Sequence, residues 1–195
     1  MSTTFNDIDG GHPINSAPHN PAATSVKVQA LAIVANFVLL VAIIASAAVA
    51  GFFYAYACSV MYGLNDSNAT VALEAMQGIN RTVRNPIFAL SFFGTALLLP
   101  VASVLTFMSG AKNAGTVLAV AALSYLGGGF FLTMAINVPM NNALALVDVS
   151  ALADPAKAWA DYEQPWSFWN WVRTGFSFAA LILAVLAFKI MPGRD

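Results

Sequence analysis

The sequence alternates between four long apolar segments and shorter polar connectors. Residues 31–56 contain no charged residue, and residues 87–108 and 116–137 form two further apolar segments. The last one starts near Trp166 and runs to Ile190. A transmembrane helix needs about 20 apolar residues, so each segment is long enough to span a bilayer. The pattern predicts an all-α membrane protein in which four transmembrane helices form one antiparallel bundle, with both chain ends on the same side.

The connector after the first span contains a shorter amphipathic segment. Residues 70–81 place apolar side chains at an approximately helical spacing but are too short to cross a membrane, so we expect a helix that lies at the surface. The apolar positions are Val71, Leu73, Ala75, Met76 and Ile79. The polar side chains on and after this helix are Gln77, Asn80, Arg81 and Arg84.

The two ends of the chain are polar, and three glycines interrupt the third span. Residues 1–27 are rich in Pro, Asn, Ser and Gly and predict a mobile tail, followed by a transmembrane domain over residues 28–191 and a short tail over residues 192–195. Gly127, Gly128 and Gly129 either allow a neighbouring helix to approach closely or soften the helix locally. Close packing is the interpretation that we favour.

Composition supports a bilayer as the environment. Hydrophobic residues make up 59% of the 195 residues and charged residues 9%, whereas a soluble domain averages about 25% charged residues. The net charge of −1 gives no electrostatic basis for binding nucleic acid. Lipid is therefore the expected partner. A second membrane protein is a further candidate.

The basic residues do not by themselves orient the protein. Four Lys or Arg residues lie on the side of the chain ends and four on the opposite side. If Arg81, Arg84 and Arg173 are held by function rather than by topology, the count favours cytoplasmic termini. The expected location is then a bacterial inner membrane.

Amides, tryptophans and one arginine gather at the ends of the third and fourth spans. Asn137 and Asn141 are four residues apart, as are Trp169 and Arg173, and Asn170 is beside Arg173 on a helix. An arginine at this depth pairs, snorkels to the interface or points into a polar cavity. Snorkelling does not explain why amides gather at the same depth. We therefore predict that Arg173 points into the bundle and contacts at least one of Gln77, Asn80, Asn137, Asn141 and Asn170.

Other kinds of site have little support in the sequence. Both histidines, His12 and His19, lie in the N-terminal tail, and no carboxylate lies within the four predicted spans. A haem or non-haem iron site with imidazole ligands and a proton-relay pump are therefore not expected. The sequence predicts neither a metal site nor a cofactor.

Four ordered motifs resemble the anthrone oxygenase family. They are residues 75–80 (Ala-Met-Gln-Gly-Ile-Asn), 85–88 (Asn-Pro-Ile-Phe), 138–141 (Val-Pro-Met-Asn) and 166–174. The resemblance covers roughly residues 30 to 190 and implies a four-helix membrane protein. Some members of the family oxidise an anthrone to an anthraquinone with molecular oxygen and no evident cofactor. Most members have no known role.

Two functions from different classes follow. The first is an oxygenase that acts on an anthrone-like or phenolic polycycle and needs a place for the ring, donors for an enolate oxygen and a proton acceptor. In this interpretation Trp169 stacks on the ring, Arg173, Asn141 and Asn170 donate to the enolate, and Tyr54 or Tyr56 relays a proton. The remaining residues of the predicted binding site are Gln77, Asn80, Asn137 and Trp166. The second function is non-catalytic binding of a lipid or quinone, or a role as a small subunit of a larger complex.

Overall fold

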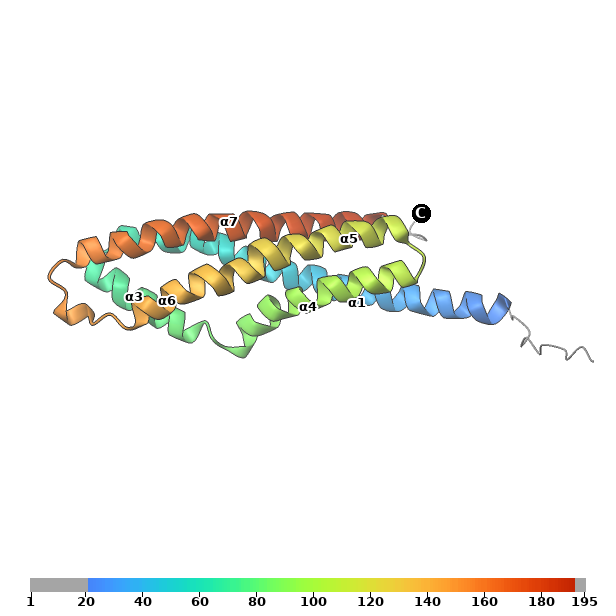
Figure 1. Ribbon diagram of the computed structural model, residues 1–195, viewed down its shortest axis with the longest axis horizontal. Helices are drawn as coiled ribbons and strands as arrows, with labels where there is room; N and C mark the ends of the chain where they lie inside the picture. The colour runs from blue at the N-terminus through green and yellow to red at the C-terminus, as the bar shows by residue number, and fades with distance from the viewer. Residues whose placement is uncertain (1–20, 192–195) are drawn as a thin grey trace, which may run out of the picture.

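Four long helices form one bundle in the computed structural model, which describes residues 21–191 (Figure 1). The four segments that can span a membrane are Val26–Asn65, Pro86–Met108, Lys112–Ala145 and Pro155–Lys189. Every element among the described residues is helical, so the predicted all-α, four-helix fold is confirmed. The predicted tails at residues 1–20 and 192–195 lie outside the described part. The first helix begins at Pro21, inside the segment expected to be a tail.

The first span is longer than the sequence pattern predicts. Helix α1 (Pro21–Ala55) continues through a π-helical turn, η1 (Tyr56–Val60), into α2 (Met61–Asn65) without a break. Residues 57–64 are still mostly apolar, and the first strong turn formers are Asn65 and Asp66. The helix therefore ends at the turn formers and not at the end of the charge-free segment.

The third span changes its helical form twice. It begins as α5 (Lys112–Ser124), becomes π-helical in η2 (Tyr125–Phe131) and η3 (Thr133–Asn137), and ends as α6 (Val138–Ala145). It therefore passes through Pro139 and ends beyond the predicted limit at residue 137. The π-helical turns come directly before the proline, and π-bulges and prolines are both common causes of bends in helices.

Two of the three glycines pack against the fourth helix, and the whole triplet lies in π-helix. A Cβ atom built on Gly128 would come within 2.0 Å of Phe176 Cγ, and one built on Gly129 would come within 3.3 Å of Ser177 Oγ, both on the fourth helix. A Cβ on Gly127 would meet no atom within 4 Å. Close packing is thus confirmed for two of the three glycines. The alternative of a softened helix is also consistent with η2, because the whole triplet lies within it.

The fourth helix, α7 (Pro155–Lys189), begins well before Trp166. The Asp154 side chain caps it by accepting a hydrogen bond from the backbone N–H of Lys157 at 2.9 Å. Its 35 residues correspond to a length of about 52 Å, against about 30 Å for the hydrocarbon core of a bilayer. Trp166 therefore marks the start of the apolar part of a longer helix and not the start of the helix itself.

The predicted amphipathic helix is present as α3 (Ala69–Thr82). Asn68 caps it by accepting from the backbone N–H of Thr70 at 2.9 Å, and its apolar face is buried. It packs against α6, α7 and the short 3₁₀ helix η4 (Val149–Ala151), at the end of the bundle opposite the C-terminus (Figure 1). Gln77 Nε2 donates to the carbonyl oxygens of Leu144 and Val147, both at 2.9 Å. These bonds tie α3 to the end of the third span.

A short loop leads from α3 to the second span, α4 (Pro86–Met108). Asn85 caps α4 by accepting from the backbone N–H of Phe88 at 3.0 Å, and Pro86 occupies the first turn, where a missing N–H has no cost. The cap and the proline agree with the predicted start of this span. The loop residue Arg84 is exposed and faces α6.

The buried apolar residues form two clusters, one on each side of the region where the predicted site residues meet. One fills the space between the four spans and includes Leu39, Leu99 and Leu118. The other lies beneath α3 and includes Met76 and Trp159. Between them, aromatic side chains of α1 and α7 surround the polar groups that the sequence places at the membrane boundary.

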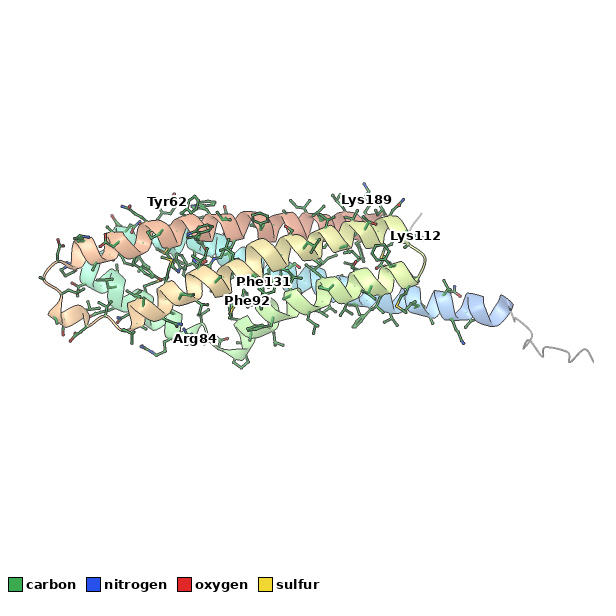
Figure 2. All side chains as sticks on the ribbon, viewed as in Figure 1. Tyr62, Arg84, Phe92, Lys112, Phe131 and Lys189 are labelled. Carbon is green, nitrogen blue, oxygen red and sulfur yellow. The ribbon has the colours of Figure 1, made fainter. Side chains whose placement is uncertain are left out.

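The antiparallel arrangement can be tested by cysteine labelling. Lys112 and Lys189 lie at one end of the bundle (Figure 2), and Lys27 lies on the exposed N-terminal part of α1. In a Cys58→Ser background, single cysteines at positions 27 and 112 should react with an impermeant maleimide from the same side of the membrane. A cysteine at Lys157 should react from the opposite side. Labelling of positions 27 and 112 from different sides would contradict the four-span bundle.

Candidate functional site

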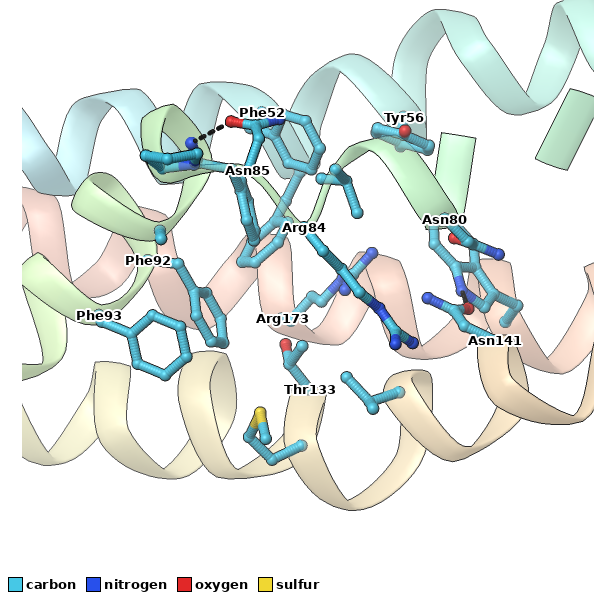
Figure 3. Close-up of a pocket in the computed structure, with 18 residues that line it drawn as sticks. Phe52, Tyr56, Asn80, Arg84, Asn85, Phe92, Phe93, Thr133, Asn141 and Arg173 are labelled. Atoms are coloured by element: carbon cyan, nitrogen blue, oxygen red, sulfur yellow. Dashed lines mark hydrogen bonds between the residues drawn. The ribbon is translucent and has the colours of Figure 1, made fainter. Parts of the chain in front are cut away.

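A cavity of about 580 Å³ lies between the end of α1, the α3–α4 loop, the start of α4, the η3–α6 segment and α7 (Figure 3). Seven aromatic side chains form much of its wall, namely Phe52, Phe53, Tyr56, Phe88, Phe92, Phe93 and Trp166. The polar side chains at its surface are Tyr56, Asn80, Arg84, Asn85, Thr133, Asn141 and Arg173. No carboxylate is among the described residues that line it. The cavity is therefore mainly aromatic and carries positive charge.

Arg173 is the buried cation of this cavity. Its side chain is 5% exposed, and its Nε donates to Asn170 Oδ1 at 2.9 Å. The guanidinium carbon lies 4.3 Å from the centroid of the Phe53 ring and 4.8 Å from that of Trp166. Arginine stacks well on aromatic faces because its charge is delocalised over a flat group. The prediction that Arg173 points into the bundle and contacts one of the five amides is confirmed.

The charge of Arg173 has no acidic partner in the described part of the chain. The ion pair found there joins Lys157 and Asp161, at 2.6 Å, on the exposed surface of α7. The terminal nitrogens Nη1 and Nη2 of Arg173 donate to none of the described residues. A buried charge without a counter-charge is costly. The guanidinium therefore presents unused donors and an uncompensated charge to the cavity.

Asn170 holds Arg173 in place without lining the cavity. It is fully buried, and its Nδ2 donates to the carbonyl oxygen of Phe53 at 3.1 Å while its Oδ1 accepts from Arg173. One amide thus connects the backbone of α1 to the guanidinium. Asn170 therefore lies behind Arg173 and not at the cavity surface, and its expected donation to a ligand stays a prediction.

Asn141 closes one end of the cavity through a hydrogen-bond network. Its Oδ1 accepts from the Tyr162 hydroxyl at 2.9 Å and from Trp166 Nε1 at 2.8 Å. Asn80 Nδ2 donates in turn to the Tyr162 oxygen at 3.3 Å. The network fixes the orientation of the Asn141 amide, whose Nδ2 donates to none of the described residues. That N–H group remains for a ligand in the cavity.

Sequence comparison supports a family for this part of the chain. The model of the anthrone oxygenase family matches residues 88–183. This segment is similar to the anthrone oxygenase family. No curated protein sequence and no solved structure matches the chain.

The anthrone oxygenase segment supplies only part of the cavity. It contributes the aromatic residues at the start of α4, the η3–α6 wall with Asn141, and Trp166 and Arg173 of α7. The wall formed by α1 and the α3–α4 loop comes from residues before the match. The predicted resemblance to the family is thus confirmed over the half of the chain that carries the buried arginine.

Of the two tyrosines predicted to relay a proton, Tyr56 lines the cavity. Its ring packs against Trp166 with centroids 5.5 Å apart, and its hydroxyl has no hydrogen-bond partner among the described residues. Tyr54 is 47% exposed, and its ring lies edge-on to Phe178 on the outside of the bundle. Residues two apart on a helix point in nearly opposite directions. Tyr54 therefore points away from the cavity, and we do not include it in the proposed site.

Of the tryptophans of α7, Trp166 lines the cavity and Trp169 does not. Trp169 is half-buried, and its ring lies against Phe168. Trp166, Asn170 and Arg173 follow the i, i+4, i+7 spacing of one helix face, and Trp169 lies at the edge of that face. Of the two tryptophans predicted to bind a ligand, Trp166 is thus the one at the cavity surface.

Two further predicted binding residues lie outside the cavity. Gln77 is used to tie α3 to α6, as described above. Asn137 is fully buried, and both polar atoms of its amide have no partner among the described residues. Asn137 ends η3 and lies four residues before Asn141, but it is buried in the bundle and does not line the cavity.

Several cavity residues carry little signal in the sequence. Five of the 14 phenylalanines in the chain line the cavity. Nothing in their spacing along the sequence distinguishes them from phenylalanines that face lipid. Arg84 follows the surface helix and is not among the predicted site residues. Its position directly before Asn85 and Pro86, which start a helix, is the feature of the sequence that could indicate a role at the site.

Proposed function

We propose that this membrane protein binds a flat polycyclic phenol or anthrone in the aromatic cavity, as its enolate or phenolate, and oxidises it with molecular oxygen. The observation that carries the proposal is the environment of Arg173. Its guanidinium is buried between aromatic rings and has unused donors. It has no acidic partner among the described residues. Such a group supports a ligand that is flat, apolar and able to become negative.

The uncompensated charge favours the anionic form of a bound acid. A guanidinium about 4 Å from an enolate oxygen stabilises it by about 4 kcal/mol at an effective dielectric constant of about 20, which corresponds to about three pKa units. Arg173 thereby acidifies the ligand, and Asn141 Nδ2 is a second donor for the same or a neighbouring oxygen. A weak proton acceptor then suffices, and the free Tyr56 hydroxyl relays the proton to water at the mouth.

The enolate of an anthrone is able to react with oxygen directly. The carbanion carbon transfers one electron to O₂, and the resulting ligand radical and superoxide combine to form a C–O bond. The hydroperoxide takes up a proton and then loses water, so that the CH₂ group becomes a ketone. One O₂ is consumed and one H₂O is released per ligand. In this scheme the protein binds, orients and stabilises the enolate.

The second candidate is binding without chemistry, of a quinone or of an anionic lipid. It is supported by the absence of a carboxylate or histidine among the described residues that line the cavity, because such a group would be a stronger proton acceptor than Tyr56. Ligand binding without oxygen uptake would favour this second function.

An oxygen-uptake assay with paired tryptophan variants tests the proposed oxidation. In lipid nanodiscs that contain the protein, 1,8-dihydroxyanthrone should be oxidised faster than in empty nanodiscs. One O₂ should be consumed for each molecule of anthrone. Trp166→Leu should lower kcat/KM about tenfold or more, because ring stacking contributes about 1–3 kcal/mol. Trp169→Leu is the matched control and should leave the rate unchanged, since Trp169 does not line the cavity. Equal effects of the two substitutions would contradict the assigned cavity.

We also propose that the termini are cytoplasmic. Of the four basic residues on the side opposite the termini, Arg84 and Arg173 line the cavity, which supports excluding them from the topological count. Two basic residues then remain on that side against four near the termini. A bacterial inner membrane stays the expected location.

A further inference from the structure

Arg84 is a second cation at the cavity that contains Arg173. It lies in the loop between α3 and α4, and its side chain reaches into the cavity from that loop, whereas Arg173 enters from α7 (Figure 3). Arg84 Nη2 donates to Asn142 Oδ1 on α6. This bond connects the loop to α6 and holds the guanidinium at the mouth. Its other N–H groups donate to none of the described residues.

Two arginines at one cavity need an explanation. Neither forms an ion pair within residues 21–191, and no carboxylate lines the space between them. Arg173 is buried and Arg84 is exposed, so water screens the charge of Arg84 while the charge of Arg173 stays uncompensated. A ligand with one anionic oxygen relieves only the charge that it contacts. A rigid ligand with two acidic groups, one at each end, satisfies both.

The chemistry of the two positions differs. Arg173 is buried between aromatic faces, where a flat ring with an enolate oxygen would stack. Arg84 is exposed at the mouth, and the side chain of its neighbour Asn85 is engaged at both ends, with Thr82 O and Phe88 N. Arg84 therefore supplies the unused donors at this side of the mouth. The planar fork of arginine matches a carboxylate in a bidentate manner.

We propose that Arg84 is a specificity-determining residue that recognises a carboxylate on the polycyclic ligand, at the end remote from the oxygen that Arg173 binds. This inference rests on the proposed function and names its substrate class: an anthrone-like polycycle that carries an aryl carboxylate. The cavity volume of about 580 Å³ lies within the range of about 300–1,000 Å³ that is usual for sites of drug-sized ligands. The carboxylate remains near water, where it stays ionised.

The test compares two air-stable, product-like probes that differ only in this group: 1,8-dihydroxyanthraquinone and its 3-carboxylate. Their Kd values are measured by quenching of tryptophan fluorescence, in nanodiscs of zwitterionic lipid. The unaltered protein should bind the carboxylate about tenfold more tightly than the neutral probe, as expected for a charge-assisted hydrogen bond. Arg84→Gln should remove this preference and leave the affinity for the neutral probe unchanged.

Arg81→Gln is the matched control. Arg81 is exposed on α3, three residues before Arg84, and does not line the cavity. It should keep the full preference for the carboxylate. An equal loss in both variants would overturn the assignment, because it would indicate general attraction of anions to a basic surface. Equal affinity of the unaltered protein for the two probes would overturn it as well but leave the proposed function standing. Failure of both probes to bind would overturn the proposed function too.

Discussion

Replacement of Arg173 by lysine is expected to lower kcat/KM for anthrone oxidation about 100-fold or more, in the range seen when a single oxyanion donor is lost, while the protein stays folded. The guanidinium donates to Asn170, stacks between Phe53 and Trp166 and still presents two nitrogens to the cavity. An ammonium is a point charge with three donors and cannot make these contacts together. Preservation of charge alone should therefore not preserve function.

Oxygen uptake and the apparent Tm in detergent should be measured together for this variant. Arg81→Lys, outside the cavity, should show unchanged kinetics and an unchanged Tm. Arg173→Met removes the buried charge altogether and should be folded but inactive, because replacing a buried charge by an apolar group of similar size is often neutral for stability. Full activity of Arg173→Lys would contradict the role of a planar, stacked guanidinium.

The largest expected effect on stability is that of Gly128→Ala, which should lower the free energy of unfolding by about 1–3 kcal/mol. A Cβ atom at this position would lie 2.0 Å from Phe176 Cγ and 2.4 Å from its Cβ. These atoms are close to the backbone of α7, so rotation of the ring does not remove the clash. The helices themselves have to move apart.

Gly127→Ala is the control for this prediction, because a Cβ atom there meets nothing within 4 Å. It should be neutral, or stabilising by up to about 1 kcal/mol from the higher helix propensity of alanine. Thermal denaturation of both variants in the same detergent compares them directly. The same Tm for the two would mean that close packing of Gly128 against α7 is not needed for the fold.

The positions of the spans and of the surface helix could be predicted from the sequence because they depend on local physics. A long apolar segment must form a helix in lipid, since its backbone groups find no other partners there. The start of α3 at Asn68 and the start of α4 at Asn85-Pro86 are likewise local, because capping side chains act within one helical turn. The burial of Arg173 could also be predicted, because amides gather at the same depth and snorkelling does not explain them.

Only the tertiary structure decided which side chains meet at the cavity. Lipid tails are as apolar as the interior of the bundle, so the hydrophobic pattern of a span does not distinguish its lipid-facing side from its buried side. For this reason the sequence could not decide whether Tyr54 or Tyr56 faces the site. It also favoured Trp169 as the residue that stacks on a ligand, whereas Trp166 lines the cavity. The π-helical turns add a second uncertainty. They change the rotation of the later part of the third helix relative to its start, and the apolar pattern does not reveal this change.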